Sequence, residues 1–135
     1  MDEKLKALIA AAIEAREQAW APYSEFQVGA ALLTSDGEQF SGANVENSSY
    51  GMTVCAERIA IFKAVTAGKR DFEMIVIATD TGEPTPPCGA CLQVMHEFAP
   101  ELQVHMVTLS GIINSYPLTE LMPRGFSKSY LKGSK

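Results

Sequence analysis

Residues 74–98 read MIVIATDTGEPTPPCGACLQVMHEF, and most of the fold can be worked out from this segment. Residues 74–79 are a short apolar run, which is typical of a strand that is buried on both faces. Three prolines then interrupt the chain, and residues 89–98 return with the spacing of a helix. The segment therefore predicts a buried strand, a proline-rich loop and a helix, with Cys88 and Cys91 where the loop enters the helix.

A second helix precedes this segment and a second strand follows it. Residues 55–65 have helical spacing and end near Gly68, a residue type that commonly stops helices. Residues 102–109 form the next apolar run, which predicts another strand. Because βαβ crossovers are right-handed, the strands that follow the two helices are expected to run parallel in one sheet. Both helices then begin at the edge where open α/β sheets bind ligands.

The N-terminal part of the chain adds a helix and a hairpin. Apolar residues recur at three- and four-residue steps through residues 3–20, as in an amphipathic helix. Two apolar stretches, residues 26–34 and 40–45, flank Asp36-Gly37, a two-residue hairpin signal. The segment after the last predicted strand holds too many glycines and prolines to assign. The whole order predicts an α/β fold, in three α/β/α layers around a mixed central sheet of about five strands.

Length and charge limit the classes of protein and partner. A chain of 135 residues predicts one domain, residues 1–135, with a core of its own. Its 11 basic and 16 acidic residues give a net charge of −5, which argues against a nucleic-acid polymer as partner. The longest apolar run, residues 7–13, is shorter than the roughly 18 residues of a membrane span, and the first residues are not a basic signal-peptide start. We expect a cytoplasmic protein with no membrane partner.

Three cysteines are too few for a disulfide framework, and their positions indicate a metal site. Cys88 and Cys91 stand three residues apart, so they share one face of the predicted helix. Cys55 begins the preceding helix, at the same edge of the sheet. Helix N-termini favour thiolates, and Zn²⁺ is the common ion for sulfur ligands. Three protein ligands leave one tetrahedral position for water, as in catalytic zinc sites.

Other uses of these residues stay open at this level. A structural Cys₃His site would need His96 or His105, but His96 lies about 12 Å along the helix from Cys88, and His105 lies inside a predicted strand. A redox Cys-x-x-Cys pair would leave Cys55 and Glu57 without a role. Glu57 lies in the first turn of its helix, where it either shuttles protons to a metal-bound water or only complements the helix dipole.

Two motifs resemble those of the small cytidine deaminases. Residues 55–57, Cys-Ala-Glu, resemble the ligand-x-Glu half of that family's zinc motif. Residues 87–91, Pro-Cys-Gly-Ala-Cys, resemble its Pro-Cys-x-x-Cys half. The likeness continues through residues 21–31, 42–47 and 123–126, so it covers nearly the whole chain.

The resemblance implies an enzyme of pyrimidine salvage that hydrolytically deaminates cytidine and deoxycytidine to uridine and deoxyuridine plus ammonia. It implies one zinc ion per chain, held by Cys55, Cys88 and Cys91, while Glu57 shuttles protons as an activated water attacks C4 of the ring. Arg58 resembles the family arginine that hydrogen-bonds a ligating thiolate. The alternatives are a related blasticidin-type aminonucleoside deaminase and a structural zinc module without catalysis.

The resemblance also implies a nucleoside site that is shared between chains, because short members of the family resemble homotetramers with sites at subunit contacts. One departure is Leu92, at a position where many relatives carry Arg, so a positive charge near the third cysteine is missing. By resemblance, the substrate-binding residues are Asn44 and Glu46 for the ribose, Phe26 beside the pyrimidine, the backbone of Ala56 as acceptor for the amino group, and Phe126 from a neighbouring subunit.

Overall fold

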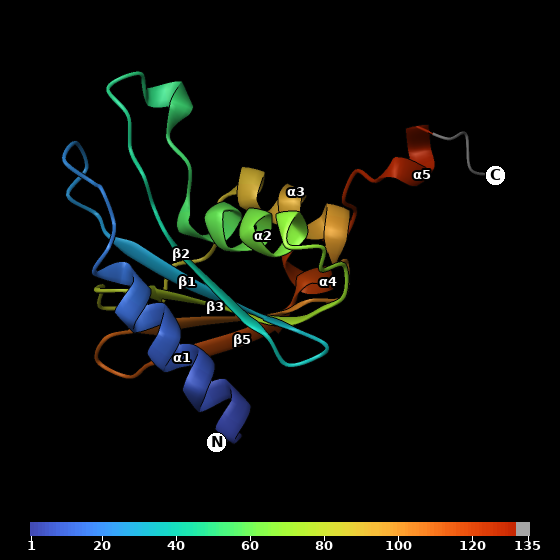
Figure 1. Cartoon of the computed structure of the whole chain (residues 1–135), viewed down its shortest axis with the longest axis horizontal. Helices are drawn as coiled ribbons and strands as arrows, with labels where there is room; N and C mark the ends of the chain where they lie inside the picture. The colour runs from blue at the N-terminus through green and yellow to red at the C-terminus, as the bar shows by residue number, and fades with distance from the viewer. Residues whose placement is uncertain (132–135) are drawn as a thin grey trace.

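A mixed sheet of five strands forms the middle layer of the molecule (Figure 1). The computed structural model describes residues 1–131, so the end of the predicted 1–135 domain lies outside the described residues. The strands are β1 (Val28–Thr34), β2 (Gln39–Ala43), β3 (Phe72–Thr79), β4 (Gln103–Thr108) and β5 (Ile113–Pro117). They are ordered β2-β1-β3-β4-β5, with β3 and β4 parallel and the other neighbours antiparallel. The expected α/β fold and its parallel pair are confirmed.

Helices cover both faces of this sheet, as predicted (Figure 1). The helices are α1 (Glu3–Arg16), the 3₁₀ turn η1 (Tyr50–Met52), α2 (Ala56–Thr66), α3 (Gly89–Phe98), α4 (Leu118–Leu121) and α5 (Lys128–Leu131). On one face, Leu8 and Ala12 of α1 pack in a cluster with Val76 of β3. On the other face, Met95 of α3 packs in a cluster with Ile75 of β3. The middle of β3, residues 74–78, is apolar throughout because its alternate residues face the two helical layers.

The start of α2 lies directly against β2. A Cβ atom on Gly42 would lie 2.7 Å from both the Ala56 carbonyl oxygen and the Ala60 nitrogen, closer than real Cβ contacts come. Glycine allows this approach because it has no Cβ. The contact sets where α2 begins, and therefore where the residues of its first turn stand relative to the sheet.

The first helix is shorter than the predicted 3–20 segment and ends at Arg16. The backbone of Trp20 instead pairs with the chain beyond β2. Its N–H donates to the Asn44 carbonyl at 2.9 Å, and its carbonyl accepts from the Glu46 N–H at 2.8 Å. This long-range pairing takes residue 20 out of the helix, although the spacing of the apolar residues continues that far.

Two other segments also differ from the sequence prediction. The connection between β1 and β2 has four residues, 35–38, rather than two, and within it Gly37 takes a φ of 93° and donates its N–H to the Thr34 carbonyl at 3.0 Å. β5 occupies part of the unassigned C-terminal segment, as a largely exposed edge strand on β4. No helix within residues 1–131 is long and apolar enough to span a membrane.

Candidate active site

Three cysteine sulfurs meet where α2 and α3 begin. Cys55 is the N-cap of α2, Cys88 is the N-cap of α3, and Cys91 lies in the first turn of α3. Their Sγ atoms all lie within 4.8 Å of one another, and those of Cys88 and Cys91 are 3.5 Å apart. Tetrahedral zinc with Zn–S bonds of about 2.3 Å separates two sulfur ligands by about 3.8 Å. The donor set and its spacing therefore fit one zinc ion.

The surroundings of the sulfurs favour negative charge. Neither cap cysteine hydrogen-bonds its own helix, so both helix N-termini direct partial positive charge at the cluster. Arg58 Nη2 also donates to Cys55 Sγ at 3.4 Å. The hydrogen bond from Cys91, together with Arg58, lowers the pKa of Cys55 to about 5, whereas the same bond and burial raise the pKa of Cys91. The chain thus stabilises a thiolate, the form of cysteine that binds metal.

Glu57 places a carboxyl group beside the sulfurs. It lies in the first turn of α2 and is only 5% exposed. This burial raises the pKa of Glu57 to about 7, because a buried site disfavours the charged carboxylate. Glu57 lines a cavity of about 280 Å³ together with Cys55 and Cys88. A buried proton-carrying group and two of the three sulfurs therefore face the same cavity.

This cavity gathers most of the residues that the resemblance implied, but Phe126 lies elsewhere. Phe126 is 55% exposed, and its carbonyl accepts from Gln93 Nε2 of α3 at 2.8 Å. Its ring stacks on Tyr130, with the ring centroids 5.9 Å apart. The predicted residues that line the cavity are Phe26, Asn44, Glu46, Cys55, Ala56, Glu57 and Cys88.

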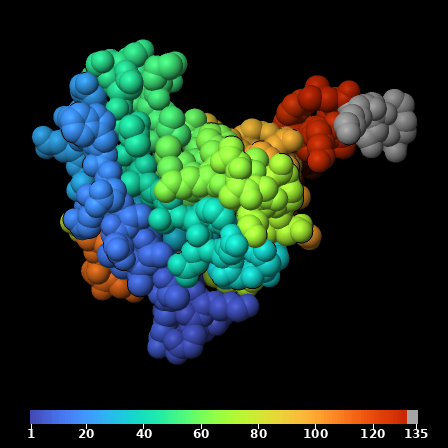
Figure 2. Space-filling view, in the orientation of Figure 1, coloured from blue at the N-terminus to red at the C-terminus, as the bar shows by residue number. Residues whose placement is uncertain are grey.

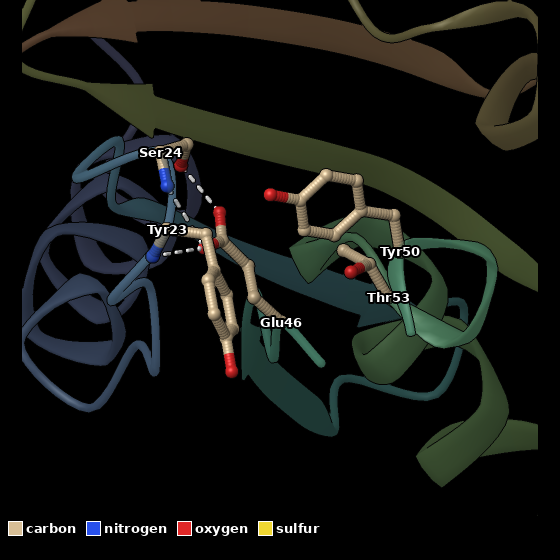
Figure 3. Close-up of a pocket in the computed structure, with 5 residues that line it drawn as sticks. All are labelled: Tyr23, Ser24, Glu46, Tyr50 and Thr53. Carbon is tan, nitrogen blue, oxygen red and sulfur yellow. Dashed lines mark hydrogen bonds between the residues drawn. The ribbon is translucent and has the colours of Figure 1, made fainter. Parts of the chain in front are cut away.

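Asn44 and Glu46 both use their side chains to bind the segment before β1. Asn44 Nδ2 donates to the Phe26 carbonyl at 2.8 Å, and Asn44 Oδ1 accepts from the Val28 N–H at 2.9 Å. Glu46 accepts from the hydroxyl and the N–H of Ser24 (Figure 3). The Ser24 hydroxyl is also the main reason why the pKa of Glu46 is lowered. These polar side chains therefore shape the cavity wall as well as lining it.

The resemblance implied that the backbone of Ala56 accepts a hydrogen bond from the amino group, and both polar groups of this backbone can be placed in the structure. Its carbonyl oxygen is directed at β2, since it lies 2.7 Å from where a Cβ on Gly42 would be. Its N–H belongs to the first turn of α2, whose N–H groups have no partner inside the helix. The free polar group of Ala56 at the start of the helix is therefore a donor.

Three threonines that had no predicted role also line the cavity, Thr53, Thr79 and Thr85. Thr79 is the last residue of β3 and is 1% exposed. Its Oγ1 lies 2.8 Å from Thr81 Oγ1 and 3.5 Å from Thr85 Oγ1. These hydroxyls tie the proline-rich loop that carries Cys88 to the end of β3. The signal in the sequence was a threonine that ends an apolar strand, followed by two more in the loop.

The histidines do not complete a Cys₃His site. The ring of His96 lies against Gly125, and His105 Nδ1 lies 2.7 Å from Ser115 Oγ between β4 and β5. Within residues 1–131, the one group of three or more metal-binding side chains consists of the three cysteines. Convergence of all three sulfurs also goes beyond what a redox pair of two cysteines needs.

Comparison with known proteins agrees with this geometry. Residues 2–107 match the family model of the cytidine and deoxycytidylate deaminase zinc-binding region. A cytidine deaminase of Halalkalibacterium halodurans is 52% identical over 128 residues, which cover 94% of this chain and 96% of that protein. A cytidine deaminase of Sporosarcina psychrophila is 50% identical over 125 residues, covering 92% of each chain.

A solved structure gives the same result in three dimensions. The crystal structure of cytidine deaminase from Burkholderia pseudomallei matches with a TM-score of 0.88 and 48% sequence identity. The match covers 93% of this chain and 100% of that chain, so the two proteins share their fold over nearly their whole length. The chain belongs to the cytidine and deoxycytidylate deaminase family, and its three cysteines are the ligands available for the zinc ion of that family.

Proposed function

We propose that this enzyme deaminates cytidine and deoxycytidine to uridine and deoxyuridine, with release of ammonia. The observation that carries the proposal is the cluster of three sulfurs beside a cavity that also holds the buried Glu57. The cavity volume of about 280 Å³ suits a small substrate rather than a polymer. Relatives at 50% and 52% identity that carry the name cytidine deaminase support this substrate over a blasticidin-type aminonucleoside.

In the proposed reaction, the chain moves protons at one end of the pyrimidine. Zinc, when bound, supplies a water-derived nucleophile at neutral pH. Glu57 takes one proton of the water and delivers it to N3 of the ring as C4 is attacked. The remaining proton of the water passes to the amino group, so that ammonia leaves and a C4 carbonyl remains. Glu57 suits this task because it is buried beside the sulfurs and faces the substrate cavity.

The other cavity residues are proposed to bind the nucleoside. Phe26 packs beside the pyrimidine, and the free N–H of Ala56 donates to an acceptor on the base. Asn44 and Glu46 hydrogen-bond the ribose with the lone pairs and the N–H that their internal bonds leave free. Arg58 withdraws negative charge from the cluster through Cys55.

A complete site is proposed to need a second chain, in a homotetramer. α5 stands away from the sheet and its helices (Figures 1 and 2), while the segment just before it contacts α3. Phe126 belongs to the segment just before α5 and is more than half exposed, so its ring is available to stack on a base in a neighbouring subunit. A mass measurement by light scattering in solution tests the assembly, and a monomer would contradict it.

We also propose that the chain is a single domain that works in the cytoplasm, in pyrimidine salvage. Two apolar clusters enclose one sheet, which supports one folding unit. All three cysteines are unpaired thiols, which is typical of proteins in a reducing compartment.

The proposed function is tested by incubating the zinc-loaded protein with cytidine and following the change in ultraviolet absorbance as uridine forms. Glu57→Gln keeps the size of the side chain but cannot carry the proton, so we expect a loss of roughly 10²–10⁴-fold in kcat. Glu97→Gln, on the exposed part of α3, is the matched control and should leave kcat unchanged. No uridine from the zinc-loaded parent, or equal rates for Glu57→Gln and the parent, would contradict the proposal.

A further inference from the structure

We propose that Ser24 is a positioning residue, which works with Glu46 to hold the turn of residues 22–26 so that the Phe26 ring stays against the cavity. The inference rests on the proposed function, because it takes Phe26 to contact the base. Ser24 and Glu46 both line the cavity, but the role proposed here is complete within one chain and needs no contact between Ser24 and the substrate.

The turn is held by a chain of hydrogen bonds that starts at Glu46 (Figure 3). Glu46 Oε1 accepts from the N–H groups of Tyr23 at 3.0 Å and Ser24 at 3.1 Å. Glu46 Oε2 accepts from the Ser24 hydroxyl. The same hydroxyl oxygen accepts from the Phe26 N–H at 3.0 Å. One serine hydroxyl therefore links the carboxylate to the backbone of the aromatic residue.

The other backbone group of Phe26 is also held by a side chain. Its carbonyl accepts from Asn44 Nδ2 at 2.8 Å, and Asn44 is only 8% exposed. Asn44 Oδ1 accepts in turn from the N–H of Val28, the first residue of β1. Phe26 lies before β1 begins, so these side-chain bonds replace the strand pairing that it lacks.

We call the side chains of Ser24, Asn44 and Glu46, with the bonds that they make to the turn, the clamp. The backbone that the clamp holds is strained at Glu25. Glu25 has a φ of 60°, and it is the one residue other than glycine within 1–131 whose φ is positive. That region of φ is unfavourable for L-residues other than glycine. Glu25 is exposed and does not line the cavity, so its own side chain does not explain the conformation. The N–H of Glu25 donates to the Ala21 carbonyl at 3.0 Å. This backbone bond and the bonds of Ser24 and Phe26 on either side hold Glu25 in that conformation.

Loss of the clamp should affect binding more than chemistry. Phe26 is 39% exposed and lines the same cavity as Cys55 and Glu57, but it stands on the segment before β1. The sulfurs and Glu57 stand on α2 and α3. A relaxed turn would move the Phe26 ring away from the base and leave the zinc ligands in place.

The first experiment separates KM from kcat in three variants. Ser24→Ala removes both bonds of the hydroxyl, and we expect KM for cytidine to rise roughly tenfold with kcat within about twofold of the parent. Ser24→Thr keeps the hydroxyl and should restore most of the parent KM. Ser49→Ala is the matched control, because Ser49 is an exposed serine in the loop after Glu46 and does not line the cavity. A fall in kcat with KM unchanged in Ser24→Ala, or an equal rise of KM in Ser49→Ala, would overturn the proposal.

A second experiment distinguishes positioning from a direct contact between Ser24 and substrate. Glu25→Gly relieves the strain in the turn. Adding it to Ser24→Ala should therefore lower the raised KM of that variant roughly two- to threefold. If it recovers none, Ser24 acts by touching the substrate, and the proposal is wrong.

Hydrogen exchange at the Phe26 amide gives a readout that does not depend on activity. We expect faster exchange in Ser24→Ala than in the parent and in Ser49→Ala, because the acceptor of that N–H is gone. Unchanged exchange would contradict the clamp. A parent that turns over no cytidine would instead contradict the proposed function and leave the exchange result to decide the clamp.

Discussion

Arg58 and Leu92 are neighbours of zinc ligands, and they differ in what they contribute to the charge of the cluster. Arg58 Nη2 donates to Cys55 Sγ at 3.4 Å, so one guanidinium offsets part of the thiolate charge. Leu92 follows Cys91 and packs against the core beneath α3. Three thiolates on a divalent ion leave a net charge of about −1, which makes a bound water less acidic than neutral ligands would. The site therefore depends on one arginine and two helix N-termini for compensation.

We expect Leu92→Arg to shift the acidic limb of the pH–rate profile to lower pH. A positive charge next to the third ligand favours the deprotonated form of nearby groups. The groups that must lose a proton for activity would then do so at a lower pH. The check is a series of kcat measurements from about pH 5 to 9, with Leu92→Met as a control that keeps the apolar packing. Superimposable profiles for Leu92→Arg and the parent would show that the missing charge does not matter.

At the scale of elements, the position of α2 links the fold to the chemistry. The helix begins with Cys55 as N-cap and brings Glu57 into the first turn. Its backbone approaches β2 so closely that Gly42 has no room for a Cβ atom. β1 carries no ligand, but its start at Val28 is bonded to Asn44, beyond the end of β2. The end of β2 therefore supports both α2, which begins at Cys55, and the cavity wall that Asn44 holds.

Gly42→Ala should destabilise the protein and weaken zinc binding together. The added methyl group would meet the Ala56 carbonyl and the Ala60 nitrogen at 2.7 Å, so α2 must move away from β2. We expect a loss of about 1–3 kcal/mol in the free energy of unfolding, as for other overpacked sites. Denaturant titration measures the loss, and competition with a chelator measures zinc affinity. Gly82→Ala is the control, since a Cβ there meets nothing within 4 Å, and an equal effect in both variants would contradict the explanation.

At the scale of the whole molecule, the described chain has a cavity with a metal-binding end but lacks one predicted aromatic residue. Phe126 does not line this cavity, and its ring stacks on Tyr130 of the same C-terminal segment. Such a segment is well placed to reach a second copy of the chain. The proposed homotetramer would then make each active site a joint product of two subunits.

Mixing two impaired variants tests whether sites are shared. We expect Glu57→Gln and Phe126→Ala each to be poorly active alone. After joint unfolding and refolding, some sites would combine an intact Glu57 with an intact Phe126 from the neighbour, so activity should rise above the mean of the two separate preparations. A control mixture of Glu57→Gln with itself should not recover. Absence of recovery in the mixed sample would place Phe126 outside the neighbouring site.

Helices and strands whose ends are signalled by nearby residues in the sequence were predicted with nearly the correct bounds, and α3 is the clearest example. α3 has the predicted bounds because a proline-rich loop precedes it and Pro100 follows it. Residues 17–20 were wrongly placed in the first helix, because the backbone of Trp20 pairs with residues more than twenty positions away. β5 has few apolar residues, so its assignment depends on β4 as a partner rather than on its own pattern.

The sequence by itself identified the three candidate zinc ligands and predicted their placement at two helix starts, because i to i+3 spacing and the right-handed crossover are general rules. Only the tertiary structure decided how the cavity wall is held. Glu46 and Ser24 lie 22 residues apart, and Asn44 and Phe26 lie 18 apart. No periodicity joins such pairs, since their bonds exist only once β1, β2 and the flanking loops have come together. The sequence also did not predict the close contact between Gly42 and the backbone of α2, for which a residue without a Cβ atom is needed.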